Sequence, residues 1–260
     1  MKKRYRIQFP KRETEELEQD EVFFYLIEPE GKRKIRFHDY DVIYRNPDLY
    51  EQLFYERLKC QSPAKISEIL KHSLGQSEDN LSELRVLDLG AGNGMMGEAL
   101  KNHGVSRLIG VDIINEAQQA AERDRLGVYD AYYVADFCNL NEDIHDEITS
   151  WMPDCLTTVA ALGFGDIPPK AFLTAFNLIQ NEGWVAFNIK ETFLYHTDTS
   201  GFSRMIRELI FSKYLDIYHL ERYRHRMSLD GKPLYYFGLS GRKHSNIPDG
   251  FLEKYDLTSC

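Results

Sequence analysis

The sequence predicts an α/β fold in which a mostly parallel sheet is covered by helices. Between residues 85 and 190, short apolar runs alternate with longer amphipathic stretches, a pattern typical of a parallel sheet. The predicted strands are 85–90, 107–112, 131–135, 154–161 and 184–190, and the predicted helices lie near 95–103, 115–125, 142–150 and 168–180. After a further helix near 200–213, the strand-like runs 214–223 and 234–242 are joined by a hairpin signal. This hairpin predicts an antiparallel strand near one edge of the sheet.

A β-hairpin and a helical cap are predicted before this sheet. Residues 22–37 form an apolar run, a Pro/Gly turn and an alternating run, which together indicate the hairpin. Asn46 and Pro47 predict the start of a helix, with Asn46 as its N-cap. Residues 1–20 are charged and weakly patterned, which predicts a mobile segment, and the polar segment 75–84 marks a boundary. We therefore expect an N-terminal extension (1–75), a core domain (76–243) and a C-terminal tail (244–260).

Charge limits the partners of the chain. The 260 residues include 32 Lys and Arg against 41 Asp and Glu, a net charge of −9. This charge repels DNA, RNA and anionic membranes at long range, and so disfavours a nucleic-acid partner. A basic and aromatic cluster could contact RNA, although alternation along a solvated edge strand is the simpler interpretation. The cluster comprises Tyr218, Arg222, Tyr223, Arg224, His225 and Arg226.

Targeting signals are missing from the sequence. No apolar run is long enough to span a bilayer, and no apolar segment follows the basic N-terminus as a signal peptide would require. The four cysteines are far apart and form no C-x-x-C, which argues against a zinc ribbon. We therefore predict a cytoplasmic protein with no membrane partner.

A glycine-rich loop follows the first predicted strand of the core domain. The strand runs into Gly90, Gly92 and Gly94, and a helix begins directly after them. Glycines let the backbone turn sharply and approach a ligand, and the helix N-terminus offers unpaired N–H groups to that ligand. We therefore predict a ligand-binding loop that comprises Asp88, Gly90, Ala91, Gly92, Asn93 and Gly94.

Two frames of this loop favour different ligands. The frame from Gly92 to Gly97 satisfies G-x-G-x-x-G, the fingerprint of a dinucleotide. However, Gly90 occupies the strand end where that fingerprint begins, and counting from Gly90 places Met95 where the last glycine should stand. The carboxylate of Asp88 also suits a cationic sulfonium better than a pyrophosphate. The frame that begins at Gly90 therefore favours a ligand with a sulfonium group.

Acidic residues stand at the ends of the next two strands. A carboxylate at Asp112 can accept hydrogen bonds from ribose hydroxyls, which both kinds of ligand contain. Asp136 can accept from the exocyclic amine of adenine while Phe137 packs on the base. The alternatives are a helix N-cap for Asp136 and ordinary core packing for Phe137.

Taken in succession, these segments resemble the class I S-adenosylmethionine-dependent methyltransferases. The resemblance covers residues 85–242: segments 88–94, 109–113 and 135–137 are similar to the first three motifs of the family, and 153–161 to its fourth strand. It implies a Rossmann-like methyltransferase fold, with a mostly parallel seven-stranded sheet and an antiparallel last strand. It also implies that Tyr40 and Tyr44 belong to a lid over the cofactor. The residues implied to bind S-adenosylmethionine are Asp88, Gly90, Ala91, Gly92, Asn93, Gly94, Asp112, Ile113, Asp136, Phe137, Ala160, Tyr40 and Tyr44.

Catalytic residues are harder to predict, because methyl transfer mainly needs alignment of the reactants and exclusion of water. The motif [N/D]-P-P-[Y/F] of the base- and amide-methylating members is absent around Pro168 and Pro169. Asp166 could orient an acceptor, although an N-cap is its simpler role, and it stands too isolated to predict a metal site. His38 and His196 are candidate general bases, with a solvated loop position as the alternative for each.

The sequence therefore predicts a methyltransferase that uses S-adenosylmethionine to methylate a small-molecule acceptor. Two alternatives stay open. An NAD(P)-dependent oxidoreductase is supported by the G-x-G-x-x-G frame. A non-catalytic S-adenosylmethionine-binding module is supported by the lack of a convincing general base.

Overall fold

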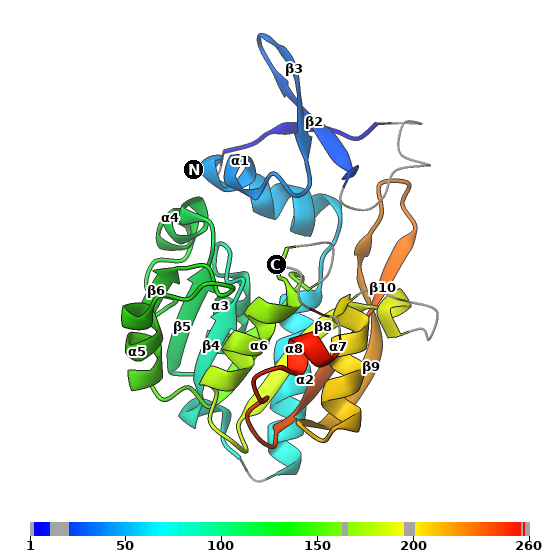
Figure 1. The fold of residues 1–260 in the computed structure, drawn as a ribbon. Helices are drawn as coiled ribbons and strands as arrows, with labels where there is room; N and C mark the ends of the chain where they lie inside the picture. Colours follow the sequence, from blue (N-terminus) through cyan, green and yellow to red (C-terminus); the bar gives the residue numbers. More distant parts are fainter. Residues whose placement is uncertain are drawn as a thin grey trace.

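The computed structural model describes residues 3–10, 21–77, 79–162, 166–194, 201–255 and 257. In this part of the chain, seven strands form one sheet in the order β6-β5-β4-β7-β8-β10-β9 (Figure 1). The strands are β4 (Arg85–Leu89), β5 (Arg107–Asp112), β6 (Ala131–Val134), β7 (Cys155–Thr158), β8 (Trp184–Lys190), β9 (Leu215–Met227) and β10 (Pro233–Lys243). Strands β4 to β8 pair in parallel, whereas β10 is antiparallel to both β8 and β9. The predicted sheet, with its antiparallel strand near one edge, is confirmed.

Helices cover both faces of the large sheet, because successive side chains of a strand point to opposite faces. The helices are α2 (Ser62–Gln76), α3 (Met95–Asn102), α4 (Asn115–Asp124), α5 (Glu142–Ser150), α6 (Pro169–Leu178), α7 (Gly201–Phe211) and α8 (Phe251–Lys254). Val86 of β4 packs in a core with α2 and α3, whereas its neighbour Leu87 packs in a second core with α5, α6 and α7.

A smaller sheet and two helical segments form a cap above the large sheet (Figure 1). The cap contains β1 (Arg6–Gln8), β2 (Phe23–Glu28), β3 (Gly31–Arg36), α1 (Tyr40–Arg45) and the π-helical segment η2 (Glu51–Arg57). Its own apolar core includes Phe24, Phe37 and Leu53. The predicted hairpin corresponds to β2 and β3. Strand β1 lies in the segment for which we predicted mobility, and three residues are too few for their alternation to reveal a strand.

The helix predicted to begin at Asn46 is present, but it begins later, and the N-cap role of Asn46 is wrong. Asn46 ends α1 instead of starting a helix, and its side-chain amide donates to the carbonyl of Val42 at 2.9 Å. The physical reason is Pro47, which disfavours helical geometry in the residue before it and so stops α1. The next helical stretch begins at Leu49 and continues into η2, after Asp48 has adopted a left-handed conformation (φ 64°).

Segments on both sides of the predicted core domain pack on the large sheet. Ile66 and Leu70 of α2 contact one of its faces, and Phe251 of α8 contributes to the core on the other. The division of the chain at residues 76 and 243 therefore stays a prediction.

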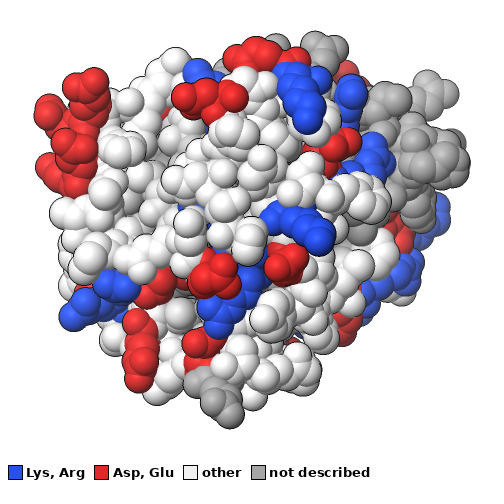
Figure 2. Space-filling view, turned by 60° about the horizontal axis from the view of Figure 1, so that its bottom comes forward, with Lys and Arg blue, Asp and Glu red and all other residues white. Residues whose placement is uncertain are grey.

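The surface carries charges of both signs. On the face shown in Figure 2, acidic and basic side chains of the described residues are interspersed in small groups. A polyanion finds no continuous basic track among the described residues of this face. None of the described helices is both long and apolar enough to cross a bilayer.

Candidate functional site

A cavity of about 620 Å³ lies between the cap and the carboxyl ends of β4, β5, β6 and β7. Strand β4 is the point at which the order of the sheet reverses, since its neighbours β5 and β7 lie on opposite sides. Ligands of open α/β sheets bind at such a point, and this volume is ordinary for a small-molecule site. Its wall contains the predicted residues Gly90, Asp112, Ile113, Asp136, Phe137, Ala160, Tyr40 and Tyr44, together with the catalytic candidates His38 and Asp166.

Asp112 ends β5 and presents its carboxylate to the cavity. One oxygen accepts from the backbone N–H of Gly92 at 2.9 Å and the other from that of Ile114 at 3.1 Å. Burial raises the pKa of this carboxyl, and the backbone N–H groups oppose that shift. Each carboxylate oxygen can accept more than one hydrogen bond, so Asp112 can hold the loop and still receive a ligand hydroxyl. The side chain of Ile113, which is 62% exposed, adds apolar surface beside it.

Asp136 and Phe137 form the cavity wall beyond β6. The Asp136 carboxylate accepts from the side chain of Asn139 at 2.9 Å and from the backbone N–H of Cys138 at 2.8 Å, and these bonds lower its pKa. This is an Asx-type turn rather than a helix cap. Phe137 is only 3% exposed and belongs to the core, yet it also lines the cavity. Core packing of Phe137 is therefore confirmed, and its contact with an adenine base stays a prediction.

Asp88 lies behind the glycine loop, outside the cavity wall. It is 1% exposed and accepts from the Tyr129 hydroxyl at 2.6 Å and the Thr157 hydroxyl at 2.7 Å. Burial raises the pKa of Asp88 to about 6, although both hydroxyl groups oppose the shift. In this position Asp88 links β4 to β7 and to the loop before β6. It supports the glycine loop from behind, and its carboxylate is not part of the cavity wall.

The rest of the loop faces the cap. Gly92 has a φ of 53°, and a Cβ there would lie 2.5 Å from the Tyr44 hydroxyl. The Tyr132 hydroxyl donates to the Gly92 carbonyl at 2.8 Å. Ala91 donates its N–H to the carbonyl of Val111. Glycine at 92 is therefore required both by the backbone conformation and by the close approach of the cap.

A charged group holds the cap against the domain. Glu51 of η2 accepts from Arg125 at 2.8 Å and from the Asn93 side chain at 2.7 Å, and Arg125 also donates to the Asn93 carbonyl. Arg125 makes a second ion pair with Glu98 at 3.0 Å, and Gly94 begins α3 beside this group with a φ of 87°. The members of this cap latch, Glu51, Asn93, Glu98 and Arg125, are far apart in the sequence and each has an ordinary surface pattern, so no sequence signal marks them.

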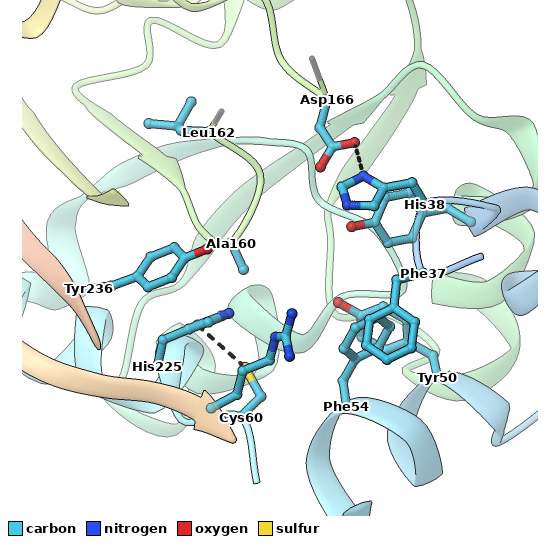
Figure 3. Close-up of a pocket in the computed structure, with 12 residues that line it drawn as sticks. Phe37, His38, Tyr50, Phe54, Cys60, Ala160, Leu162, Asp166, His225 and Tyr236 are labelled. Carbon is cyan, nitrogen blue, oxygen red and sulfur yellow. Dashed lines mark hydrogen bonds and ion pairs between the residues drawn. The ribbon is translucent and has the colours of Figure 1, made fainter. Parts of the chain in front are cut away.

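His38 and Asp166 meet across the cavity (Figure 3). The Nδ1 of His38 lies 2.7 Å from a carboxylate oxygen of Asp166. The predicted N-cap role of Asp166 is wrong: Pro168 is the N-cap of α6, and no side chain caps that end. Helix α6 begins with prolines that lack an N–H to be capped, which leaves the Asp166 carboxylate available to His38. His196 lies outside the residues that the structure describes.

A small annex of about 50 Å³ continues the cavity toward β9 and β10 (Figure 3). It shares His38, Tyr40, Tyr50, Ala160 and Asp166 with the main cavity. The rest of its wall includes Phe37, Phe54, Cys60, His225, Arg226 and Tyr236. Among the described residues, no group of three His, Cys, Asp or Glu side chains is arranged to hold a metal ion.

The predicted alternation of β9 fails at this annex. Leu234 of β10 pairs with Arg226 and Tyr235 pairs with Arg224, so His225 is an extra residue in β9. Such a bulge changes the direction of neighbouring side chains. As a result His225 and Arg226 are both buried, whereas strict alternation would have left one of them in solvent. The structure therefore places part of the basic cluster inside the molecule.

A buried polar network fixes the inner side of the annex. The Ser62 hydroxyl lies 2.6 Å from Nδ1 of His225 and 2.7 Å from the Tyr223 hydroxyl, and the Asn188 amide donates to both hydroxyl groups. The Asn188 carbonyl oxygen accepts from the N–H of Ala160, which has a φ of 59°. The loop after β7 is thereby held in the cavity wall.

No family model matches the chain, and no curated protein matches it by sequence. The structure is similar to the N-methyltransferase NodS from Bradyrhizobium japonicum WM9, solved with S-adenosyl-L-homocysteine: 15% identity, 80% of this chain and 97% of NodS covered, TM-score 0.52. For magnesium protoporphyrin IX methyltransferase from Synechocystis PCC 6803, solved with bound SAM, the identity is 14%, 70% of this chain and 79% of the other chain are covered, and the TM-score is 0.49. For an S-adenosylmethionine dependent methyltransferase from Mesorhizobium loti, the identity is 15%, 68% of this chain and 96% of the other chain are covered, and the TM-score is 0.48.

The likeness to NodS, together with the strand order, shows that this chain has the Rossmann-like methyltransferase fold that the sequence predicts. At 15% identity the likeness establishes the fold and leaves activity to the residues of the site.

Proposed function

We propose that the protein is an S-adenosylmethionine-dependent methyltransferase that methylates a small molecule bound beneath the cap. The observation that supports this proposal is the composition of one cavity at the switch point of the sheet. Asp112 and Phe137 line one part of that cavity, and the His38–Asp166 pair lines another. One end of the cavity is thus suited to a nucleoside, and the other end to a proton transfer.

The residues present fit the cofactor. Asp112 has acceptor capacity left for ribose hydroxyls, Phe137 and Ile113 offer apolar surface for adenine, and Asp136 can accept from its amine. Gly90 lets the backbone approach the methionine part. S-adenosylmethionine would supply an electrophilic methyl group on a good leaving group. The cap, with Tyr44 against the glycine loop, excludes water from the site.

His38 acts as the general base in this proposal. Asp166 accepts a hydrogen bond from Nδ1–H of His38, which fixes the tautomer in which Nε2 holds the lone pair. Nε2 then takes the proton of an O–H or N–H nucleophile as the methyl group is transferred. Asp166 is a positioning residue, because its carboxylate orients the ring and stabilises the imidazolium.

A small acceptor fits the site better than a macromolecule. The cap covers the cavity, and the annex admits only one small group. The net charge of −9 also disfavours a nucleic acid at long range.

Transfer of labelled methyl groups tests this proposal. The protein would be incubated with methyl-labelled S-adenosylmethionine and a panel of small phenols, amines and carboxylic acids, and both labelled product and S-adenosylhomocysteine would be measured. We expect acceptor-dependent label transfer that His38→Asn reduces at least a hundredfold, while the KM for S-adenosylmethionine is unchanged. Tight cofactor binding without transfer to any acceptor would instead support the non-catalytic binding module.

A further inference from the structure

Arg226 is a buried cation that the fold leaves without a counter-charge. Its side chain lies in β9 and the residue is 6% exposed. Its Nη1 donates to the carbonyl of Met227 at 3.0 Å, and its guanidinium lies 5.5 Å from the centre of the Phe37 ring. Among the residues that the structure describes, no Asp or Glu side chain forms an ion pair with it.

Arg125, whose side chain is 9% exposed, shows how this fold neutralises a largely buried guanidinium elsewhere. Arg125 forms ion pairs with Glu51 at 2.8 Å and Glu98 at 3.0 Å. An uncompensated buried charge is costly, and proteins keep one mainly where it serves a purpose. Burial lowers the pKa of Arg226, yet a guanidinium remains charged at neutral pH. Arg226 is therefore a fixed positive charge at the wall of the annex.

The Tyr40 and His225 side chains, which line the annex with Arg226, are neutral. Burial raises the pKa of Tyr40, with a further contribution from Asp166, so the phenol stays protonated at neutral pH. Burial lowers the pKa of His225 well below its ordinary value, and Arg226 adds to that shift, so the imidazole stays uncharged. Its ring lies 4.1 Å from the Tyr236 ring, centre to centre. Among the described residues of the annex wall, the one carboxylate is that of Asp166, which lies 2.7 Å from Nδ1 of His38 and forms no ion pair with Arg226. Arg226 is thus an unpaired cation among aromatic walls.

Resting on the proposed function, we propose that the methyl acceptor is a carboxylic acid whose carboxylate enters the annex and pairs with Arg226. A carboxylate matches the planar guanidinium and has the few heavy atoms that about 50 Å³ can hold. A phosphate dianion is larger and would need further cationic donors. The acceptor then extends from the annex toward His38, which lines both spaces, and presents its O–H or N–H group there.

This assignment determines which end of the acceptor reacts. The carboxylate is the anchor, and the methyl group goes to a second nucleophile near Nε2 of His38. Neutral phenols and amines of the same shape are poor acceptors, because they leave the buried charge of Arg226 unpaired.

Binding of simple carboxylates tests the proposal without knowledge of the natural acceptor. Benzoate, acetate, benzamide and inorganic phosphate would be titrated calorimetrically into the full-length protein, alone and saturated with S-adenosylhomocysteine. We expect benzoate or acetate to bind in the millimolar range and benzamide at least tenfold more weakly. Equal binding of benzoate and benzamide, or no binding of either carboxylate, overturns the proposal. Tighter binding of phosphate than of both carboxylates also overturns the proposal.

Substitutions separate Arg226 from its neighbours. We expect Arg226→Gln to abolish carboxylate binding and Arg226→Lys to retain part of it. Arg222→Gln is the matched control, because Arg222 lies on the same strand but on its solvated side, paired with Glu191. Since Arg226→Gln removes an unpaired buried charge, its Tm should equal or exceed that of the wild type without ligand. A Tm below that of Arg222→Gln would reveal an internal partner and contradict the proposal.

The carboxylate of the cofactor could occupy the annex instead of that of the acceptor. Binding of two cofactor analogues, with and without the amino acid part, distinguishes these two occupants. If Arg226 held the carboxylate of the cofactor, Arg226→Gln would weaken the binding of S-adenosylhomocysteine but not that of 5′-methylthioadenosine, which lacks the amino acid part. We expect neither affinity to change, and a selective loss of S-adenosylhomocysteine binding would overturn the acceptor assignment. Failure of S-adenosylhomocysteine to bind the wild type would remove the proposed function, whereas the titrations of the ligand-free protein would still report on the annex.

Discussion

Replacing Asp88 by asparagine should change how the stability of the protein depends on pH. Asp88 is buried behind the glycine loop, and burial raises its pKa to about 6 from an ordinary value near 3.8. Because the folded-state pKa is raised, the folded protein binds this proton more tightly than the unfolded chain does. The resulting stabilisation is fully present below about pH 3.8 and is lost as the pH rises through about 6. An asparagine side chain does not titrate, so Asp88→Asn lacks this contribution.

The size of the effect follows from the two pKa values. A difference of roughly two units corresponds to about 3 kcal/mol of unfolding free energy. About 2 kcal/mol of that change falls between about pH 4.5 and pH 8, where the unfolding equilibrium can be measured. An asparagine keeps the size of the side chain, and the hydroxyl groups of Tyr129 and Thr157 can donate to it or accept from it.

Urea unfolding at a series of pH values measures this effect. We expect the unfolding free energy of the wild type, minus that of Asp88→Asn, to fall by about 2 kcal/mol from about pH 4.5 to pH 8. Thr157→Val removes one hydroxyl that favours the ionised carboxylate, so this variant should lose the contribution at a higher pH than the wild type. A difference that is flat, or that rises with pH, would refute the assignment of a raised pKa to this carboxyl.

Three further predictions concern catalysis, the loop and the cap. His38→Asn should lower kcat by about two orders of magnitude or more at an unchanged KM for S-adenosylmethionine, and Asp166→Asn should lower it less; steady-state rates that do not change would exclude His38 as the base. Gly92→Ala should lower the Tm and weaken the binding of S-adenosylhomocysteine at least tenfold, because the new Cβ would meet the Tyr44 hydroxyl. Adding Tyr44→Phe should restore part of both the Tm and the affinity, and the absence of any rescue would exclude this steric contact as the cause. Glu51→Gln breaks the cap latch, at a cost of about 2 kcal/mol to the closed cap, and should speed dissociation of S-adenosylhomocysteine by tenfold or more in stopped-flow measurements; an unchanged rate would show that the latch does not control release.

The parallel part of the fold was predictable because each of its elements carries its own signal. The predicted helix 95–103 corresponds closely to α3 (Met95–Asn102), since the glycine loop sets its start. The predicted strand 154–161 is longer than β7 (Cys155–Thr158), because Ala160 adopts a left-handed conformation that apolar composition does not reveal. In the cap, one Asn-Pro pair is compatible with either end of a helix, and only tertiary packing distinguishes them.

The candidate site was predictable where residues follow strands directly. Asp112 and Phe137 lie at strand ends, and the topology of a parallel sheet brings such ends together. His38 and Asp166 are 128 residues apart, so each could be named from the sequence but their pairing could not. Arg226 was assigned to a solvated edge because alternation assumes a regular strand, and a single extra residue in β9 breaks that assumption.

Titration calorimetry with S-adenosylhomocysteine tests the cofactor site, on which the rest of the account depends. NADH is the competing ligand, Asp112→Ala the test variant, and Glu116→Ala the control, since Glu116 pairs with Arg45 outside the cavity wall. We predict micromolar binding of S-adenosylhomocysteine to the wild type and the control, at least a tenfold loss in Asp112→Ala, and no binding of NADH. No binding of S-adenosylhomocysteine, or a preference for NADH, would contradict the methyltransferase assignment and favour the oxidoreductase.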